Sequence, residues 1–413
     1  MSKAAGHSLS EYDWLPLSHP EMPKSTAGGT RPLLDEGREK VMSQLGAMTW
    51  QLSQLRFNKI GSLFQDQAGN YTTGECLSPS LTWHHRDSLT NINRGPYDHE
   101  SEYIEALVSA YVAHAKELAM TPHAFFAPIP DPAEYASWAG YRSAAARWND
   151  FVAIGQKIDH SKNRLAYCIA GQLMRDMIPA LLPSKSPADD HDDGGSFPLS
   201  HPDLHFGNVF VDDDLNITCV IDWGSASSVP VSELLAAHGL LRTGGGPIED
   251  SFVAAFQAGF DRASGPVPQA GPRTWHRAAM MRLFQLLVRM LSTRDYHEFE
   301  ALHALAFPRK EEGEEDGGVT QDMPALFSER ARRSENVRLL GELSQDDWSP
   351  DEVERQEGSS FGKPSLATAE KMAVARKLTL MAEMNERFVA DKRLWRWVEE
   401  ALKDIEDADI PRP

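Results

Sequence analysis

The chain has 413 residues, of which 41% are hydrophobic and 24% charged, as in an ordinary globular protein with roughly two or three domains. Its net charge of −19 excludes the basic footprint on which non-specific nucleic-acid binding depends, so we expect no nucleic-acid partner. The same acidity would attract a cationic small molecule, although it also serves solubility alone.

No part of the sequence has the pattern of a membrane segment or of a disulfide-rich domain. The three cysteines lie far apart and form no CxxC pair, which excludes a disulfide framework and a cysteine-based zinc site. The N-terminal residues contain no apolar core of the length that a signal peptide needs. The most apolar helical run, 280–291, is interrupted by Arg282 and Arg289, so we expect no membrane span. These features predict a soluble, cytoplasmic protein.

Regular structure is expected to begin only after a long lead-in. Residues 1–35 are rich in Ser, Pro, Gly and His without a sustained helical or strand period, and they predict an irregular or disordered segment. From about residue 36, apolar residues recur at gaps of three and four, which predicts a helix with one buried stripe. A short hairpin should follow at 59–73, because Asp66–Asn70 carries turn residues.

The rest of the chain is predicted to be mostly helical. Helices are expected at about 99–120, 163–182, 231–241, 249–260 and 273–293. The charged run at 308–318 predicts a linker over 306–322. Beyond it, residues 323–413 should form a helical region, since two apolar stripes there have helical spacing, one through Leu378 and one through Trp395.

The most informative stretch is 197–226, in which strand-like runs enclose a polar loop and a tight turn. The loop carries four groups that can bind metals or handle protons, namely His201, Asp203, His205 and Asn208. Residues 212–216, Asp-Asp-Asp-Leu-Asn, are a strong turn signal. The strand after this turn should therefore return antiparallel and bring Asp222 beside Asn208.

A hairpin of this kind would gather two carboxylates and an amide oxygen at one end of a small sheet. Oxygen ligands suit Mg²⁺, which prefers one or two carboxylates together with substrate phosphates. Asp203 would lie nearby without being needed as a ligand, free to accept a hydroxyl proton or to orient the hydroxyl for attack. One Asp for the nucleophile, with an Asn and a second Asp for the metal, is the arrangement that serves phosphoryl transfer.

The stretch resembles the aminoglycoside phosphotransferase and choline kinase-like family, whose members share the protein-kinase-like fold. The match reads HPDLHFGN at 201–208 and VIDW at 220–223, and the segments 55–63 and 94–96 are similar to flanking segments in some branches of that family. The resemblance implies a kinase-like domain over 36–305. It also implies ATP and Mg²⁺ as cofactors. The implied substrates are small molecules with a hydroxyl group, including cationic ones.

The resemblance also assigns roles to the residues of the motif. It implies Asp203 as the catalytic carboxylate, and Asn208 and Asp222 as the Mg²⁺ ligands. His201 is implied as a brace that holds the loop. His205 lies where similar members also carry His, and we group it with His201 as loop support, with its particular role open.

The sequence departs from the family before the first predicted helix. Members carry an N-terminal lobe, which is a β-sheet with a phosphate-covering loop and a Lys that holds the ATP phosphates. Here Lys3, Lys24 and Lys40 lie in no β context, and the glycine-rich loop 244–246 follows the catalytic loop. The predicted fold is therefore α+β and mainly helical: a kinase-like C-terminal lobe with small β-hairpins, with the nucleotide lobe largely missing. The chain is expected to be either a fragment or a member that has lost this lobe.

Three functions follow from these features. The first is an ATP- and Mg²⁺-dependent phosphotransferase that acts on a hydroxyl of an amino sugar or amino alcohol. The second is a catalytically inactive kinase-like scaffold, for which the missing lobe is the argument. The third takes Asp203-Leu204-His205 as the D-x-H of a two-metal phosphoesterase, but the companion G-D and G-N-H motifs are absent from the sequence.

Overall fold

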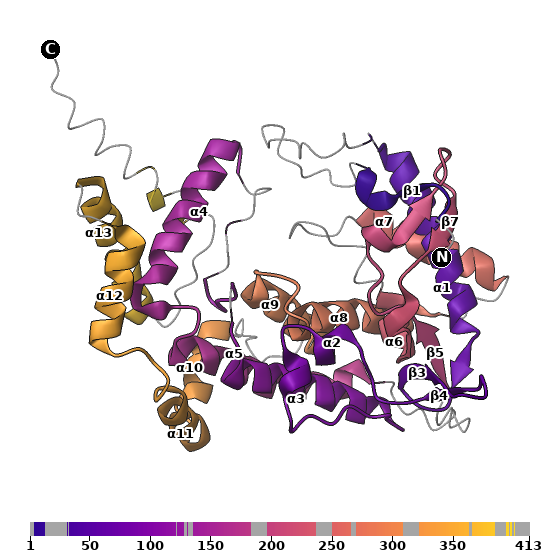
Figure 1. Ribbon diagram of the computed structural model, residues 1–413, viewed down its shortest axis with the longest axis horizontal. Coiled ribbons are helices and arrows are strands. Elements are labelled where there is room, and N and C mark those ends of the chain that lie inside the picture. The colour runs from indigo at the N-terminus through magenta and orange to yellow at the C-terminus, as the bar shows by residue number, and fades with distance from the viewer. Residues whose placement is uncertain are drawn as a thin grey trace, which may run out of the picture. The chain divides into compact units, whose positions relative to one another are not determined.

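The computed structural model describes most of the chain. The described residues are 4–12, 31, 33–120, 122–127, 130, 135–182, 196–236, 250–265, 270–308, 322–362, 366–384, 394, 395, 397, 398 and 400. They are mainly helical with small antiparallel sheets, which confirms the α+β class (Figure 1). None of their helices combines the length and the apolar character needed to cross a membrane.

The chain divides into two compact units. The first contains the described residues up to Tyr111 together with Met174–Arg289, and the second contains Val112–Leu173 and the described residues from Met290 onward. This division cuts through the predicted domain 36–305, whose bounds stay a prediction.

The first unit holds all the described strands and the predicted site. Its strands are β1 (His7–Ser8), β2 (Arg56–Phe57), β3 (Gly61–Gln65), β4 (Tyr71–Thr73), β5 (Phe197–Ser200), β6 (Val209–Val211), β7 (Ile217–Val220) and β8 (Ser227–Ser228). Its helices are α1 (Asp35–Ser53), α2 (Pro79–Thr82), α6 (Val231–Ala236), α7 (Asp250–Ser264) and α8 (Pro272–Val288). Helices α3 (Glu100–Glu117) and α5 (Ser161–Leu181) run through both units.

The second unit is helical where it is described. Its helices are α4 (Trp138–Ala153), α9 (Asp295–Ala306), α10 (Met323–Ala331), α11 (Ser334–Leu343), α12 (Pro350–Phe361) and α13 (Leu366–Met384). Trp148 and Phe151 of α4 form a buried cluster with Leu378, Trp395 and Val398. Both C-terminal apolar stripes therefore contribute residues to a buried core.

The sheets bring the two ends of the predicted catalytic segment together. One sheet has the order β2-β5-β8-β3-β4, and in it Leu199 pairs with Ser228 and Ser200 with Ser227. Because β5 and β8 are antiparallel neighbours, the loop that leaves the end of β5 at residue 201 returns to the same end of this strand pair at residue 226. The second sheet, β1-β6-β7, forms within this loop and adds the N-terminal strand to its hairpin.

The N-terminal segment contains regular structure that the sequence did not predict. His7 and Ser8 pair with Val211 and Phe210, and a short 3-10 turn, η1 (Leu9–Glu11), follows with a capping box between Ser8 and Glu11. Two residues are too few to show a period, and the strand forms only because β6, some two hundred positions later, offers a free edge. The prediction of an irregular or disordered segment is therefore wrong for residues 7–12.

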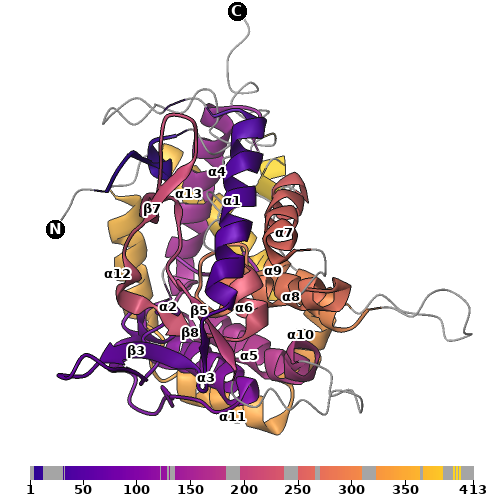
Figure 2. The ribbon, with the colours of Figure 1, turned by 90° about the vertical axis from the view of Figure 1, so that its right-hand side faces the viewer.

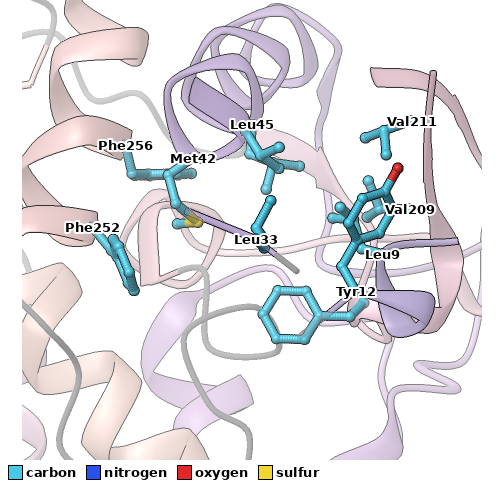
Figure 3. Packing of buried hydrophobic residues seen from close by; sticks show 11 residues of the cluster. Leu9, Tyr12, Leu33, Met42, Leu45, Val209, Val211, Phe252 and Phe256 are labelled. Atoms are coloured by element: carbon cyan, nitrogen blue, oxygen red, sulfur yellow. The ribbon is translucent and has the colours of Figure 1, made fainter. Parts of the chain in front are cut away.

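A single apolar cluster connects this segment to the hairpin. Figure 3 shows side chains of the N-terminal segment, of α1, of β6 and of α7 meeting there. Its fully buried members include Leu9, Val41, Met42, Leu45, Val209 and Val211. Burying such side chains stabilises the fold by about 1.5–3 kcal/mol each, so the cluster fixes β6 firmly against α1.

Helices α1 and α7 approach one another through two glycines. A Cβ atom at Gly259 would lie 1.9 Å from the Ser43 carbonyl oxygen, and one at Gly46 would lie 2.0 Å from that of Phe256. Figure 2 shows the two helices side by side. Because the atoms in the way belong to the backbone, a larger side chain can enter only if the helices move apart.

We expect Gly259→Ala to lower the free energy of unfolding by about 3 kcal/mol, the upper end for overpacking a filled core. Urea denaturation measures this loss. The matched control is Gly358→Ala, because a Cβ atom added at this helical glycine would meet nothing within 4 Å apart from its chain neighbours and the backbone of its own helix. This control should gain about 0.5 kcal/mol, because alanine restricts the unfolded chain. Equal effects of the two substitutions would contradict the close helix approach.

Some predicted features lie outside the described residues. These are Lys3, Lys24, the glycine-rich loop 244–246 and most of the linker 306–322. Lys40 is described, and it lies on α1, where its ammonium donates a hydrogen bond to the Asp214 carbonyl oxygen at 2.6 Å. It therefore supports the hairpin turn and lies outside any strand, as the sequence predicted.

Candidate active site

The loop that leaves β5 is braced at its first residue. The His201 Nε2 atom lies 2.8 Å from the Ile221 carbonyl oxygen, and the ring packs edge-on against Trp223 with 4.8 Å between centroids. The His201 side chain is buried, and its Nδ1 atom has no hydrogen-bond partner among the described residues. A buried imidazole that donates to a backbone carbonyl is suited to hold two chain segments together.

Asn208 connects the loop to the hairpin. Its side-chain amide nitrogen donates to the Asp203 carbonyl oxygen at 3.0 Å. Its backbone nitrogen donates to the His205 carbonyl oxygen at 2.9 Å. It ends a short 3-10 turn, η5 (Phe206–Asn208), and is buried. Since the amide nitrogen faces Asp203, the amide oxygen is the atom left for another ligand.

The hairpin β6–β7 brings Asp222 to the same end as Asn208. Val209 pairs with Val220, and the Ile221 backbone nitrogen donates to the Asn208 carbonyl oxygen at 2.9 Å. Asp222 is the next residue, and its φ of 65° and ψ of 53° lie in the left-handed region. Asp tolerates this conformation better than most residues, and the turn leaves its side chain exposed. The antiparallel return predicted from the sequence is confirmed.

The turn of this hairpin is held by one carboxylate. Asp212 accepts hydrogen bonds from the backbone nitrogens of Asp214 and Asn216 at 3.0 and 2.8 Å, and one from the Asn216 side chain at 2.9 Å. These bonds lower the pKa of Asp212, because each of them favours the ionised form. Asp212 is therefore a structural residue at the opposite end of the hairpin from Asn208.

His205 caps the turn that follows it. Its Nδ1 atom accepts a hydrogen bond from the Gly207 backbone nitrogen at 3.0 Å. Its Nε2 atom lies 4.0 Å from the Asp203 carboxylate, and the side chain is half exposed. The cap supports the loop, and the ring stands next to the predicted catalytic carboxylate.

The three predicted oxygen donors remain available in this arrangement. The side chain of Asp203 is 25% exposed, and among the described residues neither its carboxylate nor that of Asp222 accepts a hydrogen bond. Within the same part of the chain, no group of three or more His, Cys, Asp or Glu side chains is placed to hold a metal ion. A carboxylate and an amide oxygen nevertheless fit Mg²⁺, which keeps waters and substrate phosphates as its remaining ligands.

A buried layer behind the loop was not predicted from the sequence. The Arg289 guanidinium donates to the Pro202 carbonyl oxygen at 3.0 Å and lies 4.8 Å from the centroid of the Trp83 ring. Burial lowers the pKa of Arg289, and the nearby carboxylates of Glu233 and Asp203 raise it. The sequence signal for this residue is that Arg289 interrupts an apolar helical stripe, a pattern that excludes a membrane span but does not by itself indicate a buried contact.

Glu233 is the buried acid of this layer. It accepts a hydrogen bond from the Tyr103 hydroxyl at 3.2 Å. Burial raises its pKa from 4.5 to about 7, although the Tyr103 hydroxyl and the Arg289 charge both favour the ionised form. The charge state of Glu233 therefore changes near neutral pH.

We expect Glu233 to make stability depend on pH. The folded-state pKa of Glu233 lies above its unfolded-state value. Its contribution to the free energy of unfolding is therefore fully present below about pH 4.5 and is lost as the pH rises through about 7. Glu233→Gln removes this titration, so the unfolding free energy of the variant relative to wild type should rise by about 3 kcal/mol from pH 4.5 to 8. Urea denaturation across this range measures it, and a difference that does not change with pH would contradict the buried position.

The segment that carries these residues is similar to a known family. Residues 123–281 match the family model of the phosphotransferase enzyme family. The match confirms the family resemblance predicted from the motif for this segment. The matched phosphotransferase segment contains every predicted site residue, namely His201, Asp203, His205, Asn208 and Asp222. No curated protein and no solved structure matches the chain.

Proposed function

We propose that this protein transfers the γ-phosphoryl group of ATP to a hydroxyl of a small molecule of the amino sugar or amino alcohol type. The observation that carries the proposal is the β6–β7 hairpin, which holds Asn208 and Asp222 at one end. The side chain of Asn208 also holds the backbone of Asp203. We further propose that the first unit corresponds to a kinase-like C-terminal lobe.

In the proposed reaction, the acceptor oxygen attacks the γ-phosphorus of ATP. The new oxygen–phosphorus bond forms as the bond from phosphorus to the β–γ bridging oxygen breaks, and ADP leaves with that oxygen. The hydroxyl proton passes to the Asp203 carboxylate, which accepts no hydrogen bond from the described residues and is partly exposed. Positioning supplies most of the catalysis in such transfers, so the contacts that fix the loop matter as much as the base.

The residues that would hold magnesium are Asn208 through its amide oxygen and Asp222 through its carboxylate. When bound, Mg²⁺ supplies charge compensation for the phosphates. His201 keeps the two segments that carry these ligands in register by its contact with the Ile221 carbonyl oxygen. The net charge of −19 favours a cationic acceptor by long-range attraction.

A specific observation also favours the second candidate, a kinase-like scaffold without activity. Large apolar side chains on β3 and β4 are exposed, namely Phe64 at 42% and Tyr71 at 67%. Such a surface is typical of a place where another protein segment docks. If the protein is such a scaffold, the site residues would keep their geometry but the protein would not turn over ATP.

Thermal unfolding with and without nucleotide separates the two candidates. We expect saturating Mg²⁺ and ATP together to raise the melting temperature, since a ligand at about 100 times its Kd stabilises the folded state by about 2.7 kcal/mol. ATP with EDTA, and Mg²⁺ alone, are the controls and should shift it much less. An unchanged melting temperature with Mg²⁺ and ATP would refute ATP-dependent transfer by this chain and favour the scaffold.

A further inference from the structure

The residue that follows α8 is a buried arginine with a direct contact to the catalytic loop. Arg289 closes α8, where its backbone nitrogen donates to the Gln285 carbonyl oxygen at 3.0 Å. Its side chain is 4% exposed. Removing a guanidinium from water is costly, so a buried arginine in a stable fold must be compensated by hydrogen bonds and opposite charge.

The contacts of Arg289 show where this compensation comes from. Its Nη1 atom donates to the carbonyl oxygen of Pro202, the residue immediately before Asp203, at 3.0 Å. The indole of Trp83, 37% exposed, covers the guanidinium at 4.8 Å. The Glu233 and Asp203 carboxylates are both close enough to attract it.

We propose that Arg289 is a positioning residue for Asp203: it holds the loop backbone through the Pro202 carbonyl oxygen and places a fixed positive charge behind the carboxylate. Glu233 and Trp83 keep the guanidinium in place from α6 and from the end of α2. The catalytic part of this inference rests on the proposed function. The part that concerns the order of the loop does not depend on it.

A hydrogen bond from a charged donor is one of the stronger contacts available in a protein. The Arg289 contact adds to other bonds of the loop, which include the Leu204 backbone nitrogen to the His201 carbonyl oxygen at 3.2 Å, His201 Nε2 to the Ile221 carbonyl oxygen at 2.8 Å and the Ser8 hydroxyl to the Phe206 carbonyl oxygen at 3.2 Å. Loops are in general more mobile than the elements they connect, and a guanidinium anchored in the core ties this one to the rigid end of α8. Arginine suits the task because it remains charged when it is buried.

The test measures the order of the loop without any ligand. Arg289→Met alone leaves Glu233 buried without its cation, so the double variant Arg289→Met, Glu233→Gln is compared with it and with wild type. Amide hydrogen exchange is followed in peptides that cover residues 201–208 and, for global stability, in peptides of α1. Arg175→Met is the matched control, because Arg175 forms an ion pair with Glu105 at 2.7 Å on the surface of the same unit.

We expect the loop amides of the double variant to exchange at least about tenfold faster than in wild type, as the loss of a charge-assisted hydrogen bond implies. The α1 amides of the double variant, and all amides of Arg175→Met, should keep their wild-type rates. Wild-type exchange in the loop of a folded double variant would overturn the proposal.

A kinetic measurement then connects the inference to catalysis. If the chain transfers phosphate, the double variant should lose kcat at least about tenfold with its KM for ATP unchanged, because only the position of Asp203 is altered. An unchanged kcat would overturn the positioning role. If wild type shows no transfer at all, the proposed function fails, and the exchange experiment still decides whether Arg289 orders the loop.

Discussion

Asp203→Asn is expected to lower kcat for phosphoryl transfer by about 10²–10⁴-fold, the range that general base catalysis contributes. The amide has the size of the carboxylate but cannot accept the hydroxyl proton. The contact that Asp203 makes with Asn208 uses its backbone carbonyl oxygen, so the substitution leaves the loop in place. The melting temperature and the stabilisation by Mg²⁺ and ATP should therefore stay at their wild-type values.

The control for this variant is Asp214→Asn, which removes one exposed carboxylate at the turn of the same loop region. Its kcat should equal that of wild type within error. Steady-state kinetics and differential scanning calorimetry of the three proteins measure the effect. An Asp203→Asn protein with wild-type kcat would remove Asp203 from the mechanism.

Asp222→Asn should weaken Mg²⁺ binding in the presence of ATP by more than the about 10–100-fold that is typical of losing an outer-shell partner. The amide keeps a single oxygen but loses the negative charge, and a hard divalent cation depends on that charge. Asn also tolerates the left-handed backbone that position 222 requires, so the turn should survive.

Isothermal titration of Mg²⁺ into the protein with ATP measures this affinity, and Asp214→Asn serves again as the control. Asn208→Ala is less clean as a probe, because its side chain also holds the Asp203 backbone. If Asp222→Asn binds Mg²⁺ as tightly as wild type, the metal lies elsewhere and the assignment of Asp222 is wrong.

Features that depend on neighbouring residues could be predicted from the sequence. Both hairpin turns are of this kind, since Asp66 and Asp212 each accept backbone hydrogen bonds from residues two and four positions later. Asp and Asn side chains favour such turns through hydrogen bonds within a few residues of the chain, so the local composition is enough to predict them. The helices at α1, α3, α5, α7 and α8 followed from periodicity for the same reason.

Features that depend on distant residues could not be predicted. β1 exists only as the partner of β6, and its two residues carry no pattern of their own. The Arg289–Pro202 contact joins residues 87 positions apart. Helix α4 has a helical stripe, but its buried face becomes meaningful only when Trp148 meets Trp395 from the far end of the chain. Propensity and periodicity describe segments, whereas these contacts belong to the tertiary fold.

The predicted site falls between these two cases. The proximity of Asn208 and Asp222 follows from a local hairpin and was predicted correctly. The closure of the whole segment by β5 and β8 required a pairing between Ser200 and Ser227 that the sequence did not indicate. The buried support from Arg289 was not predicted because charged residues are usually exposed, and only the fold shows that Arg289 is buried and bonded to the loop through the Pro202 carbonyl oxygen.

The central claim is that the chain transfers phosphate, and detection of the product tests it most directly. Wild-type protein is incubated with Mg²⁺, γ-labelled ATP and a panel of amino sugars and amino alcohols, and the acceptors are analysed by mass spectrometry. We predict an acceptor heavier by one phosphate that appears with wild type and Asp214→Asn and is lost with Asp203→Asn or EDTA. Equal amounts of product with wild type and Asp203→Asn, or no product from any acceptor, would contradict the account.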